Sequence, residues 1–599
     1  MRPWLMATML GLVTFALVIV QQRDVGITRD ETIYFAAGDR YVDWWFDLAH
    51  GRGALDEASL NGHFGGTNNN SEHPPLMKTL FGLSHRALHG GLGVDELTSY
   101  RVPTAALHGA LVAIVYLWTT AIWGAAEGLV AALLLILMPR LLFHAGLACF
   151  DAPMVAVWFG TVAAYWKALS SRRWAIVAGV AFGLALATKH NALLLPFGLI
   201  AHSIVVGWRG MRADWGAWRG EIAGQAAGVK LRATWRLFVR RQWRHERLAL
   251  WAMALVGPLV LIALWPWLWF DTIAHVRGWI GFHLNHVHYN YEYLGDNWNH
   301  PRFPWHVPIV TTLYTVPVVT LAAAALGGRV LVARWWRDRA VQLRDGEQVS
   351  GVGAVEWPAM LLFLTAGVAI GPFLLGSTPI FGAEKHWAPA MPALAIFAGL
   401  GVVWAGRQLG AAIAELRPTW RDPLSTAGDG MKRLCLLVVG LCVCAAAAVE
   451  VRAAQPYALT NYNALAGGAP GGADRGMNRQ FWGHSALGVV PFLTSEAALA
   501  GRSLRVYTHE ASMAWPWYQK FGTVPSTLVD SGNEDAGVNS SDYALVVHEL
   551  HFNRHDFMIW KAYGTVQPVF VLRADGVPIV SVYKRPPKPA PAPAPAPAR

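Results

Sequence analysis

Long apolar runs alternate with polar linkers along most of this chain. Eleven runs come near the ~20 residues that a helix needs to cross a bilayer. They lie at 4–20, 102–122, 128–143, 152–169, 174–187, 192–206, 248–269, 308–326, 358–375, 388–405 and 434–448. With 54% hydrophobic and 15% charged residues, the 599-residue chain holds more apolar sequence than one soluble core can bury. The pattern predicts an α-helical polytopic membrane protein with about 11 transmembrane helices.

The basic residues gather in alternate linkers. Most Lys and Arg residues lie at 167–173, 209–247, 329–344 and 407–433. Counting eleven spans puts these four linkers on one side, which the excess of cations in cytoplasmic loops assigns to the cytoplasm. We therefore expect a multi-pass plasma (inner) membrane protein with a cytoplasmic N-terminus and with outer loops at 21–101 and 270–307. The net charge of +11 follows from this bias, so it does not indicate nucleic-acid binding.

The pattern changes after residue 450. Short β-rich runs at 504–508, 543–547, 569–572 and 578–583 are separated by polar and helical stretches. We expect a membrane catalytic domain over 1–450 and a small periplasmic or extracytoplasmic α/β domain over 451–585. The Pro-Ala repeat at 586–599 cannot bury a core and predicts an extended, disordered tail.

Two linkers have a composition suited to lipid. After Glu31, apolar residues recur at helical spacing (Ile33, Ala37, Tyr41, Trp44, Trp45 and Leu48), which predicts an amphipathic helix lying on the membrane. The basic insert 209–247 mixes Arg with four Trp residues, a combination typical of contact with anionic headgroups.

Asp30 and Glu31 place two adjacent carboxylates just past the first apolar run. Acidic groups at that depth are costly unless they are paired or functional. They also suit the first turn of the helix that follows, where the helix dipole favours negative charge. Sequence pattern alone leaves both explanations open.

Other polar groups stand in the same outer loops. Glu72 and His73 precede the double proline Pro74-Pro75, which forms a stiff corner able to hold them in fixed directions. Arg101 stands at the mouth of the second span. Asp151 begins the fourth span, where capping that helix is an alternative role.

Together these motifs resemble a known family. They are Asp30-Glu31, His73-Pro74-Pro75-Leu76-x-Lys78, Arg101-Val102-Pro103, Phe150-Asp151-Ala152-Pro153 and Ala187-Thr188-Lys189-His190. The set resembles transferases of the GT-C fold that use polyprenyl-phosphate sugars, within them the glycosyltransferase 39 group. That group includes protein O-mannosyltransferases and relatives that transfer aminoarabinose to lipid A. The resemblance covers the chain to about residue 399, with weaker echoes at 382–389 and 462–468.

The resemblance implies an inverting glycosyltransferase. The sugar would pass from a polyprenyl phosphate to an acceptor hydroxyl on a lipid, glycan or protein at the outer membrane face. Asp30 would be the base that takes the hydroxyl proton, with Glu31 as a helper that orients it or raises its pKa. The donor phosphate would meet a larger set of residues: Glu72, His73, Lys78, Arg101, Lys385 and His386. His73 stands where aminoarabinose transferases usually have lysine, which puts that lysine's role in doubt here.

A divalent metal ion is a further expectation. Glu72, Asp151 and His286 are the candidate ligands, although a single phosphate leaving group carries little enough charge for protein cations to suffice. His548, His551 and His555 have a spacing that permits metal binding on a helix, but no fourth ligand is evident, so a structural role is favoured.

Two other functions fit a membrane protein of this kind. A transporter or flippase of lipid-linked sugars would carry ionisable groups near the middle of its spans, and these spans are nearly free of them. A membrane-anchored binding protein would act through the C-terminal domain. The expected partners are a polyprenyl-phosphate-linked sugar, membrane lipids and an acceptor that the sequence does not identify.

Overall fold

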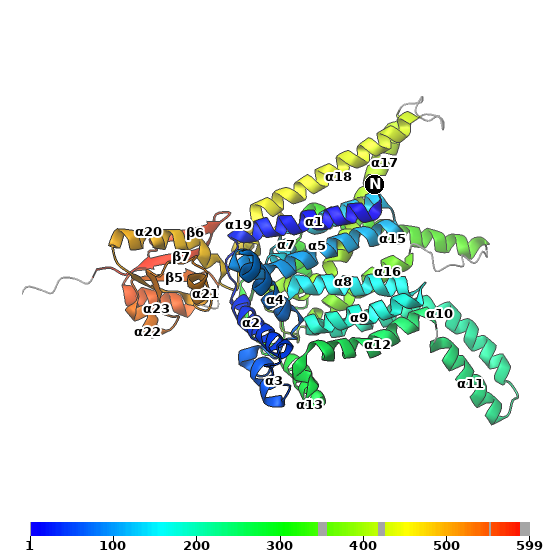
Figure 1. Ribbon diagram of the computed structural model, residues 1–599. Coiled ribbons are helices and arrows are strands. Elements are labelled where there is room, and N and C mark those ends of the chain that lie inside the picture. Colours follow the sequence, from blue (N-terminus) through cyan, green and yellow to red (C-terminus); the bar gives the residue numbers. More distant parts are fainter. Residues whose placement is uncertain (1, 243, 346–355, 417–425, 550–552, 588–599) are drawn as a thin grey trace, which may run out of the picture.

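A helical bundle with a small sheet at one end forms the protein (Figure 1). The computed structural model describes residues 2–242, 244–345, 356–416, 426–549 and 553–587. The helices of the bundle are α1 (Pro3–Gln21), α5 (Glu96–Ile122), α6 (Ala125–Ile136), α7 (Pro139–Ala145), α8 (Asp151–Ala168), α9 (Arg172–Thr188), α10 (Leu195–Ile222), α12 (His245–Leu264), α14 (Val307–Thr315), α15 (Val318–Asp345), α16 (Glu356–Ile370), α17 (Met391–Glu415) and α18 (Thr426–Ala454).

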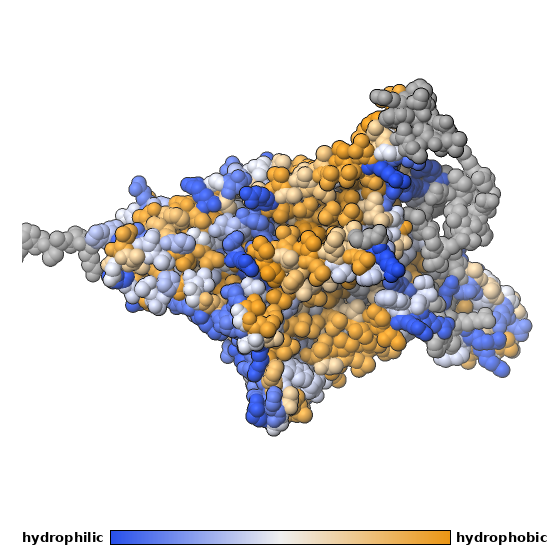
Figure 2. Space-filling model, turned by 45° about the horizontal axis from the view of Figure 1, so that its top comes forward, coloured by the Kyte–Doolittle hydropathy of each residue, from blue (hydrophilic) through white to orange (hydrophobic). Residues whose placement is uncertain are grey.

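Ten of the eleven predicted spans coincide with a single helix or with the bent pair α6 and α7. Among the described residues, eight helices are long and apolar enough to cross a membrane. A ninth span is counted if α6 and α7, bent by 73° at their junction, are taken together. The other two predicted spans correspond to α8 and α9, which are 18 and 17 residues long. Figure 2 shows a broad orange region of apolar side chains across the visible face of the bundle, as expected for a multi-pass membrane protein.

One predicted span is displaced. The run 308–326 is not one helix, because α14 ends at Thr315 and α15 begins at Val318. Pro317 lies in the break, where it lacks the N–H that a continuous helix would need. The membrane-crossing stretch is instead Val318–Arg337, so part of the predicted linker 329–344 continues the helix.

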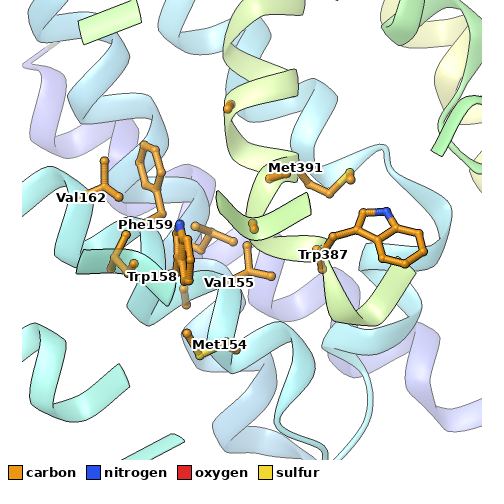
Figure 3. Packing of buried hydrophobic residues seen from close by; sticks show 14 of the residues in the cluster. Met154, Val155, Trp158, Phe159, Val162, Trp387 and Met391 are labelled. Atoms are coloured by element: carbon orange, nitrogen blue, oxygen red, sulfur yellow. The ribbon is translucent and has the colours of Figure 1, made fainter. Parts of the chain in front are cut away.

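Close helix packing builds the interior of the bundle. Gly11 of α1 and Gly109 of α5 face each other, and a Cβ on Gly109 would lie 2.6 Å from the Gly11 carbonyl oxygen. Small residues at such crossings let two helices approach in the absence of a hydrophobic driving force. Larger side chains fill the centre, where Trp158 and Phe159 of α8 pack near Trp387 and Met391 (Figure 3).

The first predicted outer loop, 21–101, folds into three helices, α2 (Arg29–Ala49), α3 (Glu57–Phe64) and α4 (Leu76–Leu92). The predicted amphipathic helix is confirmed as α2, but its predicted place on the membrane is wrong. Tyr41 and Trp44 are buried against Leu60 and Phe64 of α3. Burial of this face against protein removes it from lipid, because the loop supplies its own apolar partner.

The other large loop predicted to face outward, 270–307, contains α13 (Thr272–Leu284) and the short hairpin β1 (Tyr291–Tyr293) and β2 (Asp296–Trp298). At the other end of the bundle, α10 continues into the basic insert and turns back as α11 (Ala227–Gln242). These two helices project from the bundle, away from the sheet (Figure 1). Trp218 of α10 donates a hydrogen bond to Thr234 of α11 at 3.1 Å.

The C-terminal part is an α/β unit, as predicted. Its helices are α19 (Gly468–Asp474), α20 (Val490–Ala500), α21 (Trp515–Lys520), α22 (Asp535–Ser540) and α23 (Asn553–Tyr563). Its strands are β3 (Leu504–Tyr507), β4 (Leu528–Asp530), β5 (Tyr543–Val547), β6 (Phe570–Ala574) and β7 (Val577–Lys584), in the order β4-β3-β5-β7-β6. β3 is parallel to β4 and β5, whereas β7 is antiparallel to β5 and β6. The sequence pattern missed the three-residue strand β4.

The α/β unit packs directly on the first outer loop. Ile27 and Phe35 from the loop share one buried cluster with Trp515 and Leu545 from the unit. Phe143 of α7 joins the same cluster. The first loop and the C-terminal α/β unit, which are far apart in the sequence, therefore share one hydrophobic core.

Candidate active site

Glu31 is a fully buried structural carboxylate at the start of α2. Thr28 caps this helix, and its backbone N–H donates to Glu31 at 2.9 Å in a capping box. Arg101 of α5 binds both carboxylate oxygens at 2.8 Å, and the Ala148 N–H adds a third contact at 2.8 Å. Every oxygen of Glu31 is therefore engaged by protein donors.

Arg101 is equally engaged. Besides Glu31, its guanidinium donates to the carbonyl groups of Gln22, Val25 and Gly26 and to the Gln22 side chain, at 2.8 to 3.1 Å. The side chain is 0% exposed. The family resemblance predicts that Arg101 meets the donor phosphate, but in the structure its N–H groups hold the chain between α1 and α2.

Asp30, one residue earlier, lies in a different environment. Its side chain is 25% exposed, and its two oxygens form ion pairs with Lys385 and Arg29. Lys385 Nζ lies 3.9 Å from Oδ2, and Arg29 Nε lies 3.9 Å from Oδ1. Both contacts are longer than hydrogen bonds, so the carboxylate keeps room for another donor.

Lys385 is a buried cation held beside aromatic rings. It lies in the short 3-10 helix η6 (Ala383–His386), and its Nζ lies 4.0 Å from the ring centre of Trp482 and 5.1 Å from that of Phe381. Burial lowers the pKa of Lys385, while Asp30 and Asp151 act in the opposite direction. Among the described residues its closest charged partner is Asp30, so most of its hydrogen-bonding capacity is open to a ligand.

The backbone of Trp482, whose ring lies over Lys385, has an unusual conformation and is held by a hydrogen bond. Trp482 has a φ of 77°, which is uncommon for a residue other than glycine. Its carbonyl accepts a hydrogen bond from the Arg29 N–H at 3.0 Å. The start of α2 therefore holds both Asp30 and the aromatic neighbour of Lys385. Sequence reasoning missed Trp482, because 452 positions separate it from Asp30.

Asp151 and Lys189 form a second charged pair. Asp151 begins α8, and Lys189 follows the end of α9, with Nζ 2.7 Å from Oδ1 of Asp151. Both side chains are less than a tenth exposed. The sequence marks Lys189 as part of the motif Ala187-Thr188-Lys189-His190, and its position between two polar residues after an apolar span is a further signal for a functional role. Asp30, Asp151 and Lys189 all act electrostatically on Lys385. We call these four residues the charged cluster.

Lys78 and Glu72 shape the loop instead of facing this cluster. Lys78 is 0% exposed and donates to the carbonyl oxygens of Asn70 and His73 at 2.6 and 2.9 Å. Glu72 accepts a hydrogen bond from the Asn70 side chain at 2.8 Å. The ammonium group of Lys78 therefore donates its hydrogen bonds to the turn before the double proline.

Three histidines from three outer segments converge beside the charged cluster. Each of His73, His190 and His283 offers a ring nitrogen within 4.8 Å of the others, which is compatible with holding a metal ion. Nδ1 of His73 and Nδ1 of His190 are buried without a hydrogen-bond partner. The Nε2–H of His283 donates a hydrogen bond to the Glu72 carbonyl at 2.9 Å, which orients its ring. Burial lowers the pKa of His283 to about 4, so this imidazole is neutral at pH 7 and able to ligate.

The predicted metal set is not brought together. Of Glu72, Asp151 and His286, the second is paired with Lys189 and the third contacts the Val287 carbonyl at 2.8 Å. In the part of the chain that the structure describes, the metal-compatible group consists of His73, His190 and His283. Neutral imidazoles can converge here without the repulsion that a carboxylate pair would bring.

His386 and the C-terminal histidines have other partners. His386 is buried and contacts the Phe381 carbonyl through Nε2, and its own carbonyl accepts from Asn191 at 3.1 Å. His548 contacts Ser581 at 2.8 Å, whereas His555 contacts Tyr507. His551 lies outside the described residues.

The α/β unit reaches the charged cluster through an ion pair. Arg29, next to Asp30, contacts Glu510 of the 3-10 helix η11 (His509–Ala511). Burial raises the pKa of Glu510, and Arg29 opposes that shift. Sequence reasoning also missed this pair, since nothing local marks Glu510 as a partner of the first loop.

The matching family is that of the dolichyl-phosphate-mannose-protein mannosyltransferases. It matches residues 72–220, about a quarter of the chain. The matched segment includes Glu72, His73, Arg101, Asp151 and Lys189, but neither Asp30 nor Lys385. The match confirms the resemblance to glycosyltransferases that use polyprenyl-phosphate sugars, and it supports a transferase activity.

Solved structures offer more distant likenesses. ArnT from Cupriavidus metallidurans bound to undecaprenyl phosphate is 14% identical, with a TM-score of 0.44 over 96% of this chain and 97% of that chain. AglB from Archaeoglobus fulgidus, in complex with an inhibitory peptide and a dolichol-phosphate, is 12% identical, with a TM-score of 0.46 over 93% and 71%. Likenesses at this level do not by themselves assign an activity. Comparison with curated protein sequences gives no match.

Proposed function

We propose that the protein is an inverting glycosyltransferase that moves a sugar from a polyprenyl phosphate to an acceptor hydroxyl at the outer face of the membrane. The observation that carries this proposal is the pair of Asp30 and Lys385. A partly exposed carboxylate lies 3.9 Å from a buried ammonium that has room for another ligand. Transfer from a lipid phosphate needs these two groups, a proton acceptor and a cation for the leaving phosphate.

The proposed step balances as follows. The acceptor hydroxyl gives its proton to Asp30 while its oxygen bonds to the anomeric carbon. The bond from that carbon to the phosphate oxygen breaks, and the departing phosphate keeps the electron pair. Lys385, with Lys189 behind it, stabilises the negative charge on the phosphate. Low water access strengthens this interaction, since Lys385 and Lys189 are both buried.

Glu31, Arg101 and Lys78 take positioning roles in this proposal. Their contacts hold the loop that carries Asp30 and the turn before the double proline. A base needs a free lone pair facing the acceptor, and Glu31 offers none that is not engaged by a protein donor.

A divalent ion, if used, would be held by His73, His190 and His283. Three imidazoles with a remaining open position are a common donor set for catalytic zinc, where the ion acts as a Lewis acid. The unpartnered Nδ1 atoms of His73 and His190 support this choice of ligands.

The test uses the purified full chain in lipid nanodiscs. A panel of polyprenyl-phosphate sugars is offered, and release of the lipid phosphate is followed with and without a chelator. We expect release with one donor in the wild type and release slower by about 10²–10⁴ in Asp30→Asn, while Asp43→Asn on the exposed face of α2 behaves like the wild type. Equal release by Asp30→Asn would contradict the assignment of the base. Movement of intact donor across a bilayer without release would favour a flippase, and binding without either would favour an anchored binding protein.

A further inference from the structure

A basic cavity lies at the end of the bundle opposite the sheet. It has a volume of about 450 Å³ and lies between α15, α17 and the start of α6. Four arginines line it: Arg329, Arg334 and Arg337 of α15 and Arg407 of α17. α17 connects the two ends of the molecule, because its first turn follows the segment that holds Lys385 (Figure 1).

The charges in this cavity are not balanced. Its acidic lining residue is Glu127, whose Oε1 lies 2.8 Å from Arg407. Arg329, Arg334 and Arg337 have no ion pair with any residue that the structure describes. Like charges gathered around one concavity repel each other, so an anion bound among them would be stabilising.

Apolar residues also line the cavity, beside the arginines. Leu326 and Leu400 line it from within two membrane-spanning stretches, Val318–Arg337 and Ala388–Glu415. Trp123 and Trp404 stand beside the arginines, in the mixed environment where Trp is enriched at membrane interfaces. A ligand that fills this space has a negative head among the arginines and an apolar part along the leucines.

We propose that this cavity binds the phosphate headgroup of an anionic phospholipid, from the leaflet opposite the transfer site. Arginine suits this ligand, because its planar guanidinium donates two parallel hydrogen bonds to phosphate oxygens. Basic pockets between transmembrane helices are known places for such headgroups. The glycosyl transfer proposed above is not needed for this inference. Bound lipid would fix the end of α15 against α17, and α17 begins one residue after Ala390 in the segment behind Lys385.

The experiment measures lipid binding to the purified full chain by native mass spectrometry. Phosphatidylglycerol and the zwitterionic phosphatidylcholine are titrated against the wild type and against the triple variant Arg329→Gln, Arg334→Gln, Arg337→Gln. The matched control is Arg172→Gln, Arg173→Gln, Arg232→Gln, which removes three exposed cations outside the cavity.

We expect the wild type to prefer phosphatidylglycerol and the triple variant to bind it about 100-fold more weakly, since each arginine near a headgroup contributes roughly a factor of five. The control should keep the wild-type affinity. Equal weakening in both variants, or equal affinity of the wild type for the two lipids, would overturn the proposal. A competition arm adds inorganic phosphate, and full displacement of the lipid by millimolar phosphate would overturn the lipid as occupant in favour of a soluble anion. Circular dichroism and gel filtration of both variants establish that they are folded.

Discussion

Asp30 and Glu31 are neighbours in the chain but belong to regions of opposite character. Glu31 sits in a closed clamp, in which Arg101, Thr28 and Ala148 engage its oxygens and no surface is left. Asp30 sits in the charged cluster, where the nearest cations are 3.9 Å away and a quarter of the side chain is exposed. The contrast distinguishes a carboxylate whose oxygens are all bound by protein donors from one whose oxygens stay available to a ligand.

The physical reason lies in the cost of burial. A buried carboxylate must receive hydrogen bonds and an opposite charge, and once it has them it has nothing to offer a substrate. A carboxylate with loose partners is less stabilising, but it can accept a proton. The clamp holds the start of α2, and it thereby fixes the direction of the residue before it.

Replacing Asp30 by Asn tests the chemical side of this contrast and should have the largest effect. We expect kcat for sugar transfer to fall by about 10²–10⁴, the usual contribution of a general base. The melting temperature should stay within the error of the wild type, because the Asp30 side chain has no hydrogen bond to any residue that the structure describes. A large fall in melting temperature would show that Asp30, like Glu31, has a structural role.

Replacing Glu31 by Ala tests the structural side. Arg101 would stay buried without its partner, which destabilises a protein by about 3–5 kcal/mol. Thermal unfolding in detergent measures this loss. The double variant Glu31→Gln, Arg101→Met removes both charges and should recover part of the stability. If Glu31→Ala is as stable as the wild type but inactive, Glu31 takes part in the transfer reaction and its assignment as a structural residue is wrong.

Lys385 allows the pH dependence to be tested. Lys385→Met should lower kcat/KM for the donor by about 10–100-fold, the value of one or two charge-assisted hydrogen bonds. The ammonium is charged only below its pKa, and burial lowers that pKa, so kcat/KM should fall with rising pH earlier than for an ordinary lysine. Lys385→Arg keeps the charge at high pH and should shift this alkaline limb upward. An unchanged limb would show that another group titrates there.

The histidine group should give the smallest effect on transfer and a clear effect on metal content. Zn²⁺ added to the chelator-treated protein should bind with a stoichiometry near one, measured by elemental analysis after gel filtration. His283→Ala should abolish that binding, whereas His300→Ala, exposed in the same loop, should leave it unchanged. Equal metal content in both variants would contradict the proposed ligands.

Much of the architecture could be predicted from local pattern. Apolar runs of membrane length placed ten of the eleven predicted spans, and short β-rich runs placed four of the five strands of the sheet. The displaced span at 308–326 had a local cause, the proline at 317, that the apolar run concealed. The amphipathic helix was identified by its period, but its period could not tell whether lipid or protein covers the apolar face.

The site was only partly predictable. The motifs singled out Asp30, Asp151 and Lys385, and the structure brings all three into one electrostatic neighbourhood. The same motifs predict phosphate-binding roles for Arg101 and Lys78. In the structure the N–H groups of both side chains donate hydrogen bonds to neighbouring carbonyl groups. A cationic residue type is visible in a sequence, whereas the use of its hydrogen bonds is not.

The sequence by itself determined the membrane topology class, the helix that begins at Arg29 and the presence of an acidic pair at its first turn. These follow from interactions over a few residues: apolar length, helical period and the capping box from Thr28 to Glu31. Only the tertiary structure decided which acid is paired and which is open, and which aromatic ring covers Lys385. Those outcomes depend on Arg101, Ala148 and Trp482, which come from distant parts of the chain and meet Asp30 and Glu31 only after the bundle and the α/β unit have packed together.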